Sequence, residues 1–311
     1  MQSATIPTAW SGVFSVLPTP FDHSGALDLN SLARVIALYL RAGVDGLVVL
    51  GVTSEAARLN DAERLQVIES AAAAVEGRVP LVVGASADGV RRAIEYSRAA
   101  RDAGASAVLV SPPRLARPTA DAVVGFYTAL AEAVDLPLVV QDYPPVCGFT
   151  MEPALLVRVA LQVASVAAIK LEDPPTPWKI ARIRDLGGPQ TPAILGGLGG
   201  VYLLEELEAG ASGTMTGFAY PEILVRVVQL WNKGQREEAA GWFYRYVPLM
   251  RFEFQEGIGI ALRKEILRRR GALREATIRP PGLRPDASTL ASLERLLGWL
   301  REQGGAEWSW D

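Results

Sequence analysis

Residues 103–110 read Ala103-Gly104-Ala105-Ser106-Ala107-Val108-Leu109-Val110, a glycine turn that runs directly into a short apolar segment. The same arrangement recurs at residues 42–46 and 209–213, where Ala-Gly again precedes a candidate strand. A glycine at such a point can adopt the left-handed conformation that ends a helix. The repeated unit is therefore predicted to be a helix, a tight turn and a parallel strand.

Short apolar segments of this kind recur along the chain. They are Val13–Leu17, Gly46–Leu50, Leu81–Val83, Ala107–Val110, Leu138–Gln141, Val166–Lys170, Ala193–Leu195 and Gly213–Thr216. Because nearly all their residues are apolar, they are typical of parallel strands buried on both faces. Amphipathic helical spacing marks the segments between them, such as Leu29–Arg41, Ala62–Val75, Val90–Ala103, Ala120–Val134 and Pro153–Ala164. Asn60 and Glu63 have the spacing of a helix N-cap and its reciprocal partner.

This alternation predicts an α/β fold, a closed (β/α)₈ barrel of the TIM type, rather than an open doubly wound sheet. No glycine-rich motif follows the first strand to favour a dinucleotide-binding fold. After Pro221 the pattern is helical only, over Ile223–Trp231, Glu237–Phe252, Gly259–Arg270 and Ser288–Leu300. We therefore expect a barrel over residues 1–233 and a C-terminal helical extension packed on it over residues 234–311. The terminal Trp308-Ser309-Trp310 fits two alternatives, docking on a partner surface or a frayed tail.

The composition excludes several classes of protein. The chain has 311 residues, 50% of them apolar, and its net charge of −3 gives no footprint for nucleic acid or an anionic membrane. One cysteine, Cys147, excludes an internal disulfide and a thiolate metal cluster. One histidine, His23, excludes paired-histidine metal motifs. Acid–base chemistry must therefore come mainly from carboxylates, tyrosine, lysine or the substrate.

Two further features of the sequence predict the cellular location of the protein. No apolar run approaches the ~18 residues that span a bilayer. No Lys or Arg precedes Arg34, so the basic start of a secretory signal is missing. We expect a cytoplasmic protein.

Catalytic groups of such barrels gather at the carboxyl ends of the strands. The candidates at those ends are Thr53, Ser54, Arg114, Gln141, Tyr143, Lys170, Gly196, Gly197 and Thr216. Thr53 and Ser54 form a turn that can receive a carboxylate, although capping their own turn is the commoner use of such residues. The Gly196–Gly200 segment can receive a phosphate or can simply give backbone clearance beside a ligand.

Lys170 is the most informative residue in the chain. The other three lysines, Lys179, Lys233 and Lys264, fall in helical patterns, where solvent exposure is expected. Period-two alternation places Lys170 on the same strand face as Val166 and Ala168. If that face lines the barrel, burial disfavours the ammonium and favours the free amine that a Schiff base requires. The alternative is a structural ion pair at the strand end, with Glu172 or Asp173.

These features occur together in one known family. The chain resembles the dihydrodipicolinate synthase / N-acetylneuraminate lyase family of Schiff-base-forming lyases and aldolases over about residues 10–300. The resemblance rests on Gly51-x-x-x-Glu55, the Pro144 turn, Ile169-Lys170, Gly196-Gly197, Gly12-Val13-Phe14 and Pro18-Thr19-Pro20-Phe21. It implies an imine between Lys170 and a 2-oxo acid such as pyruvate, whose carboxylate Thr53 and Ser54 would hold. It also implies a homo-oligomer, commonly a dimer of dimers (a homotetramer), that needs no metal or organic cofactor.

The chain departs from the synthase branch of that family at several positions. Val52 stands where the branch has the first threonine of a Thr-Thr pair, Gln141 where it has a tyrosine, and Val146 where it has an arginine; Pro113–Arg114 stand near the place of an aromatic residue. The tyrosine–threonine proton relay is therefore missing, although Tyr143 could share the face of Gln141. Gln141-Asp142, Ser54-Glu55 and Met215-Thr216-Gly217 are more similar to the branch that dehydrates 2-keto-3-deoxy sugar acids.

The resemblance thus implies dehydration or retro-aldol cleavage of a 2-keto-3-deoxy sugar acid. An imine to Lys170 acidifies C3 of the substrate, because the protonated nitrogen draws electrons toward an enamine. Ser54 through a water, Tyr143 and a substrate group are the candidates for proton transfer. The expected substrate-binding residues are Thr53, Ser54, Gln141, Gly196, Gly197, Arg114 and Thr216.

Three other functions stay open from the sequence. One is a synthase-like condensation of pyruvate with an aldehyde. Another is a barrel that binds a phosphorylated ligand through residues 196–200 and 216–217. A third is a sensor of sugar acids that has lost the proton relay and does not catalyse.

Overall fold

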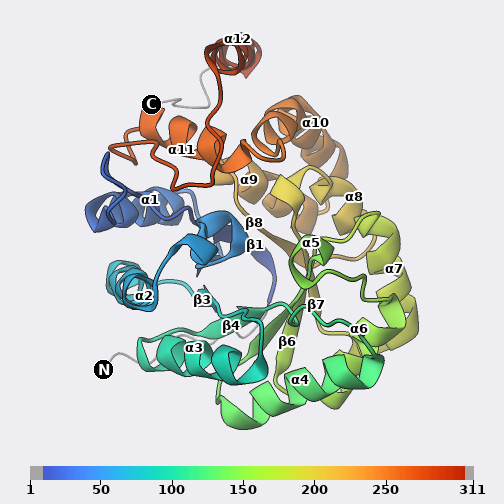
Figure 1. The fold of residues 1–311 in the computed structure, drawn as a ribbon. Coiled ribbons are helices and arrows are strands. Elements are labelled where there is room, and N and C mark those ends of the chain that lie inside the picture. Colours follow the sequence, from blue (N-terminus) through green and yellow to red (C-terminus); the bar gives the residue numbers. More distant parts are fainter. Residues whose placement is uncertain (1–9, 305–311) are drawn as a thin grey trace.

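The computed structural model describes residues 10–304, which form a closed barrel of eight parallel strands (Figure 1). Each strand pairs with the next, and β8 pairs with β1. The strands are β1 (Gly12–Val16), β2 (Gly46–Val49), β3 (Leu81–Gly84), β4 (Ala107–Val110), β5 (Leu138–Asp142), β6 (Val166–Leu171), β7 (Ala193–Gly196) and β8 (Gly213–Thr216). The predicted (β/α)₈ barrel is confirmed, and each strand end lies within one residue of its expected place.

Helices surround the strands on the outside of the barrel (Figure 1). They are α1 (Leu29–Arg41), α2 (Asp61–Val75), α3 (Val90–Asp102), α4 (Ala120–Ala133), α6 (Pro153–Gln162), α7 (Thr176–Gly187), α8 (Leu203–Glu208) and α9 (Pro221–Asn232). The short helix α5 (Pro144–Cys147) lies instead inside this ring, over the strand ends (Figure 1). The helices α5 and α8, which are only four and six residues long, have no counterpart among the predicted segments. Helix α7 begins directly after two prolines and contains Lys179, which the sequence places in a helical pattern.

The glycine turns behave as the sequence predicts. Gly43, Gly104 and Gly210 have φ values of +81°, +93° and +98°, and each lies between a helix and the strand that follows. The Asn60 side chain accepts a hydrogen bond from the Glu63 N–H, and the Glu63 carboxylate accepts one from the Asn60 N–H. Both local signals therefore end or start elements where expected.

Apolar side chains fill the barrel from two sides. A large cluster lies between the strands and the surrounding helices. A second cluster fills the interior, and its members are Trp10, Phe14, Val16, Val48, Val82, Ala107, Leu109, Val139, Ala168, Leu195 and Met215. Because these side chains pack the interior, the barrel has no open channel. A functional site is therefore expected at the carboxyl ends of the strands.

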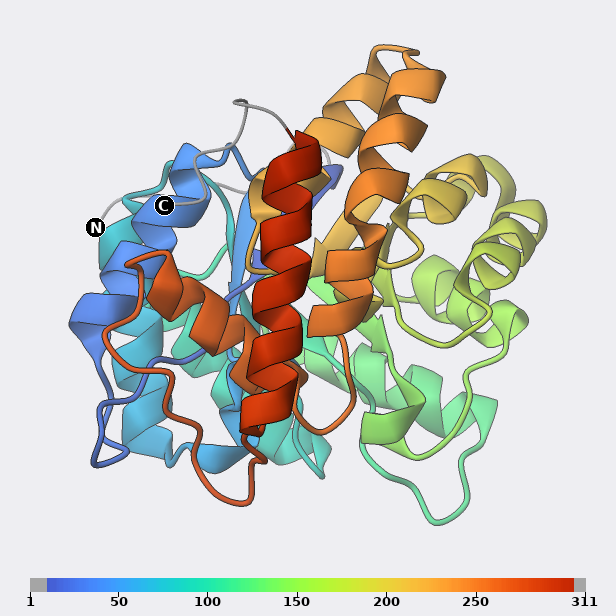
Figure 2. The same ribbon diagram turned by 90° about the horizontal axis from the view of Figure 1, so that it is seen from above.

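Three helices follow the barrel: α10 (Arg236–Glu253), α11 (Gly259–Arg269) and α12 (Ala287–Gly304). Helix α10 packs against α8, α9, α11 and α12, and α12 runs beside it when the molecule is seen from above (Figure 2). The proposed division at residues 233 and 234 falls in the turn between α9 and α10 and stays a prediction. The Trp308-Ser309-Trp310 tail lies outside the described residues. No helix in the described range has the length and apolar character needed to cross a membrane.

Candidate active site

Gln141 and Lys170 lie side by side at the mouth of the barrel. They are Cα partners on β5 and β6, and both side chains are buried. They stand two residues after Val139 and Ala168, which belong to the interior cluster. Since side chains alternate along a strand, both point into the barrel.

One expectation about this face is wrong. Val166 belongs to the outer cluster, not to the face of Ala168 and Lys170. The register shifts where Leu138 pairs with Val166 but Val139 pairs with Ala168, so β6 carries one extra residue at this point. At a bulge of this kind, the side chains that follow the extra residue change to the opposite face of the strand. Regular alternation therefore begins at Ala168, and it places Lys170 in the barrel interior.

The Lys170 ammonium does not stand alone. Its Nζ lies 3.0 Å from Glu172 Oε2, and the two side chains are only 5% and 11% exposed. Gln141 Nε2 donates a 2.7 Å hydrogen bond to the same Glu172 oxygen. The predicted alternative, an ion pair with Glu172, is therefore present.

Glu172 gives the pair a chemical use that the sequence analysis misses. A carboxylate within hydrogen-bond distance of an ammonium can take its proton and leave a nucleophilic amine. The sequence does contain a signal for this role of Glu172. Residues 170 and 172 lie two apart at a strand end, so their side chains share a face.

Two glycines make room for buried carboxyls. A Cβ on Gly197 would lie 2.4 Å from Glu172 Cγ, and a Cβ on Gly196 would lie 1.7 Å from Glu206 Oε2. The expected backbone clearance at this segment is therefore used, within this chain, for Glu172 and Glu206. Glu206 is fully buried, accepts a 2.6 Å hydrogen bond from Thr176 Oγ1, and has its pKa raised to about 8 by burial.

The glycine loop after β7 is poorly suited to a phosphate. The Gly199 N–H donates to Thr216 Oγ1 at 2.8 Å, and the Gly200 N–H donates to the Gly197 carbonyl at 2.9 Å. Residues 196–200 are all buried. Since these donors already have partners, the geometry argues against the phosphate-binding alternative. Thr216 lies at the mouth, where its hydroxyl oxygen holds this loop.

Tyr143 lies close to the Lys170–Glu172 pair. It is half-buried directly after β5. Burial raises the pKa of its phenol, and the negative charges of Glu172 and Glu256 raise it further. The structure thus brings Gln141, Tyr143, Lys170 and Gly197 together around Glu172.

The Thr53-Ser54 turn belongs to a short 3₁₀ helix, Val52–Ser54, after β2. Ser54 Oγ donates to the Leu17 carbonyl at 2.5 Å and accepts from the Gly51 N–H at 3.2 Å. The buried Ser54 hydroxyl therefore holds its own turn against the end of β1, as the alternative reading of this turn expects. Thr53 is half-buried next to it.

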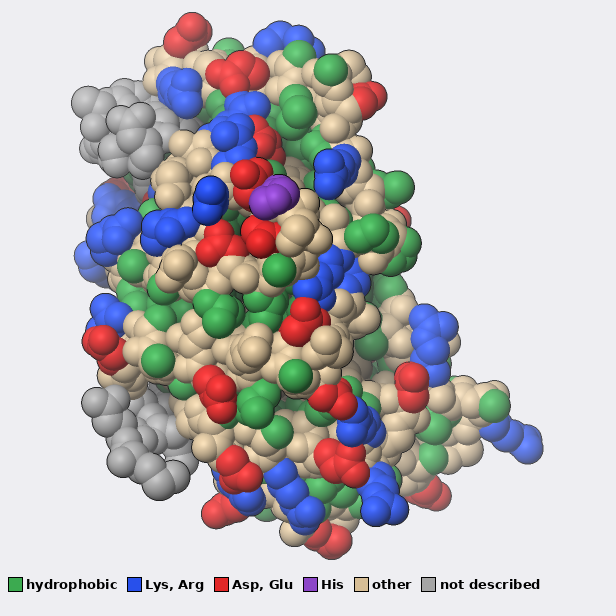
Figure 3. Space-filling model, turned by 60° about the vertical axis from the view of Figure 1, so that its left-hand side comes forward, with side chains coloured by type: hydrophobic (Ala, Val, Ile, Leu, Met, Phe, Trp, Pro, Cys, Tyr) green, Lys and Arg blue, Asp and Glu red, His purple; other side chains and the backbone are tan. Residues whose placement is uncertain are grey.

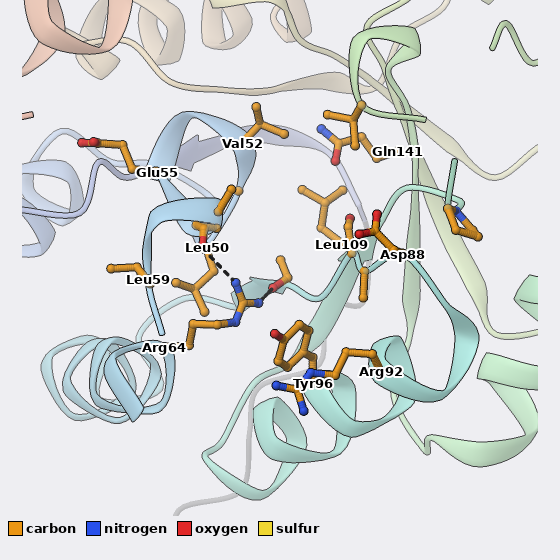
Figure 4. A pocket seen from close by; sticks show the side chains of 18 of the residues that line it. Leu50, Val52, Glu55, Leu59, Arg64, Asp88, Arg92, Tyr96, Leu109 and Gln141 are labelled. Carbon is orange, nitrogen blue, oxygen red and sulfur yellow. Dashed lines mark hydrogen bonds between the residues drawn. The ribbon is translucent and has the colours of Figure 1, made fainter. Parts of the chain in front are cut away.

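A cavity of about 720 Å³ opens over the ends of β2 to β5. Figure 4 shows Gln141 on one side of it and Arg64 with Tyr96 on the other. Arg114 also lines it and donates to the carbonyls of Pro145 and Val146 at 2.8 and 3.0 Å. A guanidinium thus lies beside Val146, the position where the synthase branch has its own arginine. Lys170 is not among the lining residues, so Gln141, its partner on β5, is where this cavity meets the Lys170–Glu172 pair.

Two of the lysines expected at the surface are buried, which corrects the sequence analysis. Lys179 is 3% exposed and Lys264 is 0% exposed. Lys179 Nζ lies 2.6 Å from Asp142 Oδ2, and Lys264 Nζ lies 2.5 Å from Glu55 Oε1. Burial raises the pKa of Asp142 to about 6 despite this cation, and burial lowers the pKa of Lys264 to about 8. Each lysine is buried because a carboxylate from elsewhere in the chain pairs with it.

His23 is exposed on a face where side chains of both charges are mixed (Figure 3). Across residues 10–304, no group of three or more His, Cys, Asp and Glu side chains is arranged to hold a metal ion.

Comparison with known proteins places these features in context. Residues 9–298 match the model of the dihydrodipicolinate synthetase family. The chain is 32% identical to an L-2-keto-3-deoxyarabonate dehydratase of Azospirillum brasilense, over 95% of this chain and 97% of that protein. It is also 32% identical to a 4-hydroxy-tetrahydrodipicolinate synthase of Methanospirillum hungatei, over 82% of this chain and 88% of that protein.

Among solved structures, the fold is similar to that of a dihydrodipicolinate synthase from Rhodopseudomonas palustris. The TM-score is 0.89 at 33% identity, over 96% of this chain and 99% of that chain. A second similar structure is the dihydrodipicolinate synthase from Thermotoga maritima, with a TM-score of 0.87 at 28% identity, over 93% and 98% of the two chains.

Proposed function

This chain belongs to the dihydrodipicolinate synthetase family, and we propose that it is a Schiff-base-forming lyase acting on a 2-keto-3-deoxy sugar acid. One observation carries the proposal. Lys170 points into the barrel mouth with the Glu172 carboxylate 3.0 Å from its amine nitrogen. This pair supplies the nucleophile and the proton acceptor that imine chemistry needs.

The first step forms the imine. Glu172 takes a proton from the Lys170 ammonium, and the free amine attacks C2 of the 2-oxo acid. The nitrogen of the adduct passes one proton to the former carbonyl oxygen, which becomes a hydroxyl, and the protonated Glu172 gives its proton to that hydroxyl, which leaves as water. The product is a protonated imine between Lys170 and C2, and Glu172 is again a carboxylate.

The second step uses the imine as an electron sink. Glu172 removes a C3 proton to form the enamine and then gives that proton to the C4 hydroxyl, which the enamine expels as water. Hydrolysis of the resulting unsaturated imine releases the dehydrated product from Lys170. If a base instead removes the proton of the C4 hydroxyl, the C3–C4 bond breaks and an aldehyde leaves, which is retro-aldol cleavage. We favour dehydration, because of the similarity around Gln141-Asp142 and because a relative identical at 32% is named as a dehydratase.

The residues at the mouth favour this substrate class over the synthase reaction. Gln141 cannot ionise as a tyrosine can, and the absence of a positioned acid–base group typically costs about 10²–10⁴ in rate. Its amide oxygen can nevertheless bind a substrate hydroxyl, as can Arg114. Thr53 is proposed to receive the carboxylate of the 2-oxo acid, with the backbone of the turn that Ser54 holds.

The test combines trapping with turnover. Borohydride with pyruvate should add one reduced pyruvyl mass to the intact protein, located on the peptide that contains Lys170. Lys170→Ala should lose the adduct and keep the fold. Five- and six-carbon 2-keto-3-deoxy acids are then offered beside pyruvate with aspartate semialdehyde. Labelling at another lysine, or synthase turnover without activity on any sugar acid, would overturn the proposal.

The assembly and location are part of the same proposal. We expect a homo-oligomer built as a dimer of dimers, and a cytoplasmic location. Light scattering coupled to size exclusion measures the mass of the assembly, and a monomer at micromolar concentration would contradict the first expectation. Fractionation of the source cells tests the second.

A further inference from the structure

We propose that Lys179 is a positioning residue of this enzyme: from outside the barrel its ammonium ties the ends of β5 and β6 together, and so fixes Glu172 opposite Lys170. The inference rests on the proposed function, because it takes Lys170 and Glu172 as the reacting pair.

The contacts of Lys179 join two strand ends. Its Nζ lies 2.6 Å from Asp142 Oδ2, at the last residue of β5, and 2.7 Å from Asp173 Oδ2, two residues beyond β6. The Lys179 side chain is 4% exposed and that of Asp142 is 0% exposed. The ammonium therefore sits in a protein environment, where an ion pair is little weakened by water or salt.

Glu172 lies between the two ends that Lys179 holds. Its backbone N–H donates to the Asp142 carbonyl at 2.9 Å, and the next residue, Asp173, is paired with Lys179. Thus the backbone of Glu172 is bound on one side and anchored one residue later. Its carboxylate then reaches Lys170 and Gln141 on the other face of the strands.

The charges explain why a cation is required there. Asp142, Glu172 and Asp173 lie close enough that the two neighbouring carboxylates raise the pKa of Asp142. Neither carboxylate oxygen of Asp142 has a hydrogen bond of good geometry among residues 10–304, so its charge is balanced by the ion pair with Lys179. Without Lys179, a buried carboxylate would lose its cation, and repulsion would push the β5 and β6 ends apart.

The experiment compares kcat and KM in folded variants of the full chain. Lys179→Met removes the charge and keeps the length of the side chain. Lys179→Arg keeps a cation that can bond both carboxylates. Asp142→Asn, a near-isosteric variant, removes the ion pair on the β5 side and leaves Lys179 paired with Asp173. It tests the same contact if Lys179→Met does not fold. Lys233→Met, at an exposed lysine after α9, is the matched control.

We expect Lys179→Met to lose about 10- to 100-fold in kcat, since misplacing a reacting group by about 1 Å has such an effect. KM should stay within about threefold, because no substrate contact is removed, and Lys179→Arg should recover most of the loss. Asp142→Asn should lose kcat in the same direction, and Lys233→Met should match the wild type.

Failure of the proposed function and failure of the proposed role of Lys179 would give different results. A wild-type protein that forms no pyruvyl adduct at Lys170 would overturn the proposed function. A wild type that traps pyruvate, beside a folded Lys179→Met or Asp142→Asn protein with wild-type kcat, would overturn only the role of Lys179. A raised KM with unchanged kcat would do the same.

Discussion

Gln141 Nε2 donates a 2.7 Å hydrogen bond to Glu172 Oε2, across 31 residues of sequence. The same oxygen lies 3.0 Å from Lys170 Nζ. A neutral amide therefore holds the carboxylate without adding a charge, and it aims one oxygen at the amine. In this chain Gln141 serves as an orienting group, which suits the proposed role of Glu172 as proton acceptor.

Glu172→Gln should lower kcat by about 10²–10⁴, because the amide cannot accept the proton that the carboxylate takes. Lys170 is still present, so borohydride should still trap pyruvate on its peptide after long incubation. Steady-state kinetics on the best 2-keto-3-deoxy acid make the measurement. Glu69→Gln, at an exposed glutamate of α2, is the control and should keep wild-type kcat. A Glu172→Gln protein within threefold of wild type would show that the proton acceptor lies elsewhere.

Gly197→Ala should reduce kcat by at least about tenfold. A loss of this order is expected when a reacting group is displaced by a fraction of an ångström or more. The added Cβ would lie 2.4 Å from Glu172 Cγ, so the carboxylate must move away from Lys170. Gly125→Ala is the matched control, because nothing lies within 4 Å of its Cβ on α4. That control should keep kcat and gain about 0.5–1 kcal/mol of stability in denaturant titrations. Equal activity of the two variants would mean that Glu172 need not stay in place.

Glu206→Gln should stabilise the protein at high pH and leave it unchanged at low pH. Burial raises the pKa of Glu206 to about 8 from 4.5. Between these values the unfolded chain releases a proton that the folded chain keeps, so the wild type loses stability as the pH rises. The glutamine has no proton to release, and it can still accept from Thr176.

The stability advantage of Glu206→Gln should therefore grow by up to about 1.4 kcal/mol per pH unit in this interval. Thermal or urea unfolding at several pH values from 5 to 8 provides the readout. Glu208→Gln, at an exposed neighbour on α8, should follow the wild type at every pH. A pH-independent difference between Glu206→Gln and wild type would count against a neutral, buried Glu206.

Lys264→Met should cost about 1–3 kcal/mol of unfolding free energy, because the buried Glu55 carboxylate loses one of its two paired cations and keeps only Arg58. The lost contacts are the 2.5 Å ion pair to Glu55 and a 2.8 Å hydrogen bond to the Thr277 carbonyl. Lys233→Met, which removes an exposed lysine, should change stability by less than about 1 kcal/mol. Adding Glu55→Gln to Lys264→Met should recover part of the loss. No difference between the two lysine variants would show that the pair does not join α11 to the β2 loop.

The barrel could be predicted because its signals are local. Gly104 with the apolar run Ala107–Val110 specifies a helix end and a strand within a few residues, and such a unit repeated along the chain leaves few topologies. Lys170 was identifiable for the same reason, since it ends an apolar strand whose carboxyl end must face the barrel mouth. The same spacing places Glu172 on the face of Lys170, although the sequence predicts for it only a structural ion pair.

The burial of Lys179 and Lys264 could not be predicted in this way. Their helices show the spacing of surface elements, and a charged side chain is buried only where an opposite charge meets it. Glu55 lies 209 residues from Lys264, so the pairing exists only once α11 packs over the β2 loop. The bulge in β6 is a further case, because an extra residue shows only against the neighbouring strand. Local patterns of the chain thus specify the barrel and the place of Lys170 at its mouth. The partners of its buried charges depend instead on contacts between distant segments, where desolvation must be balanced by a specific ion pair.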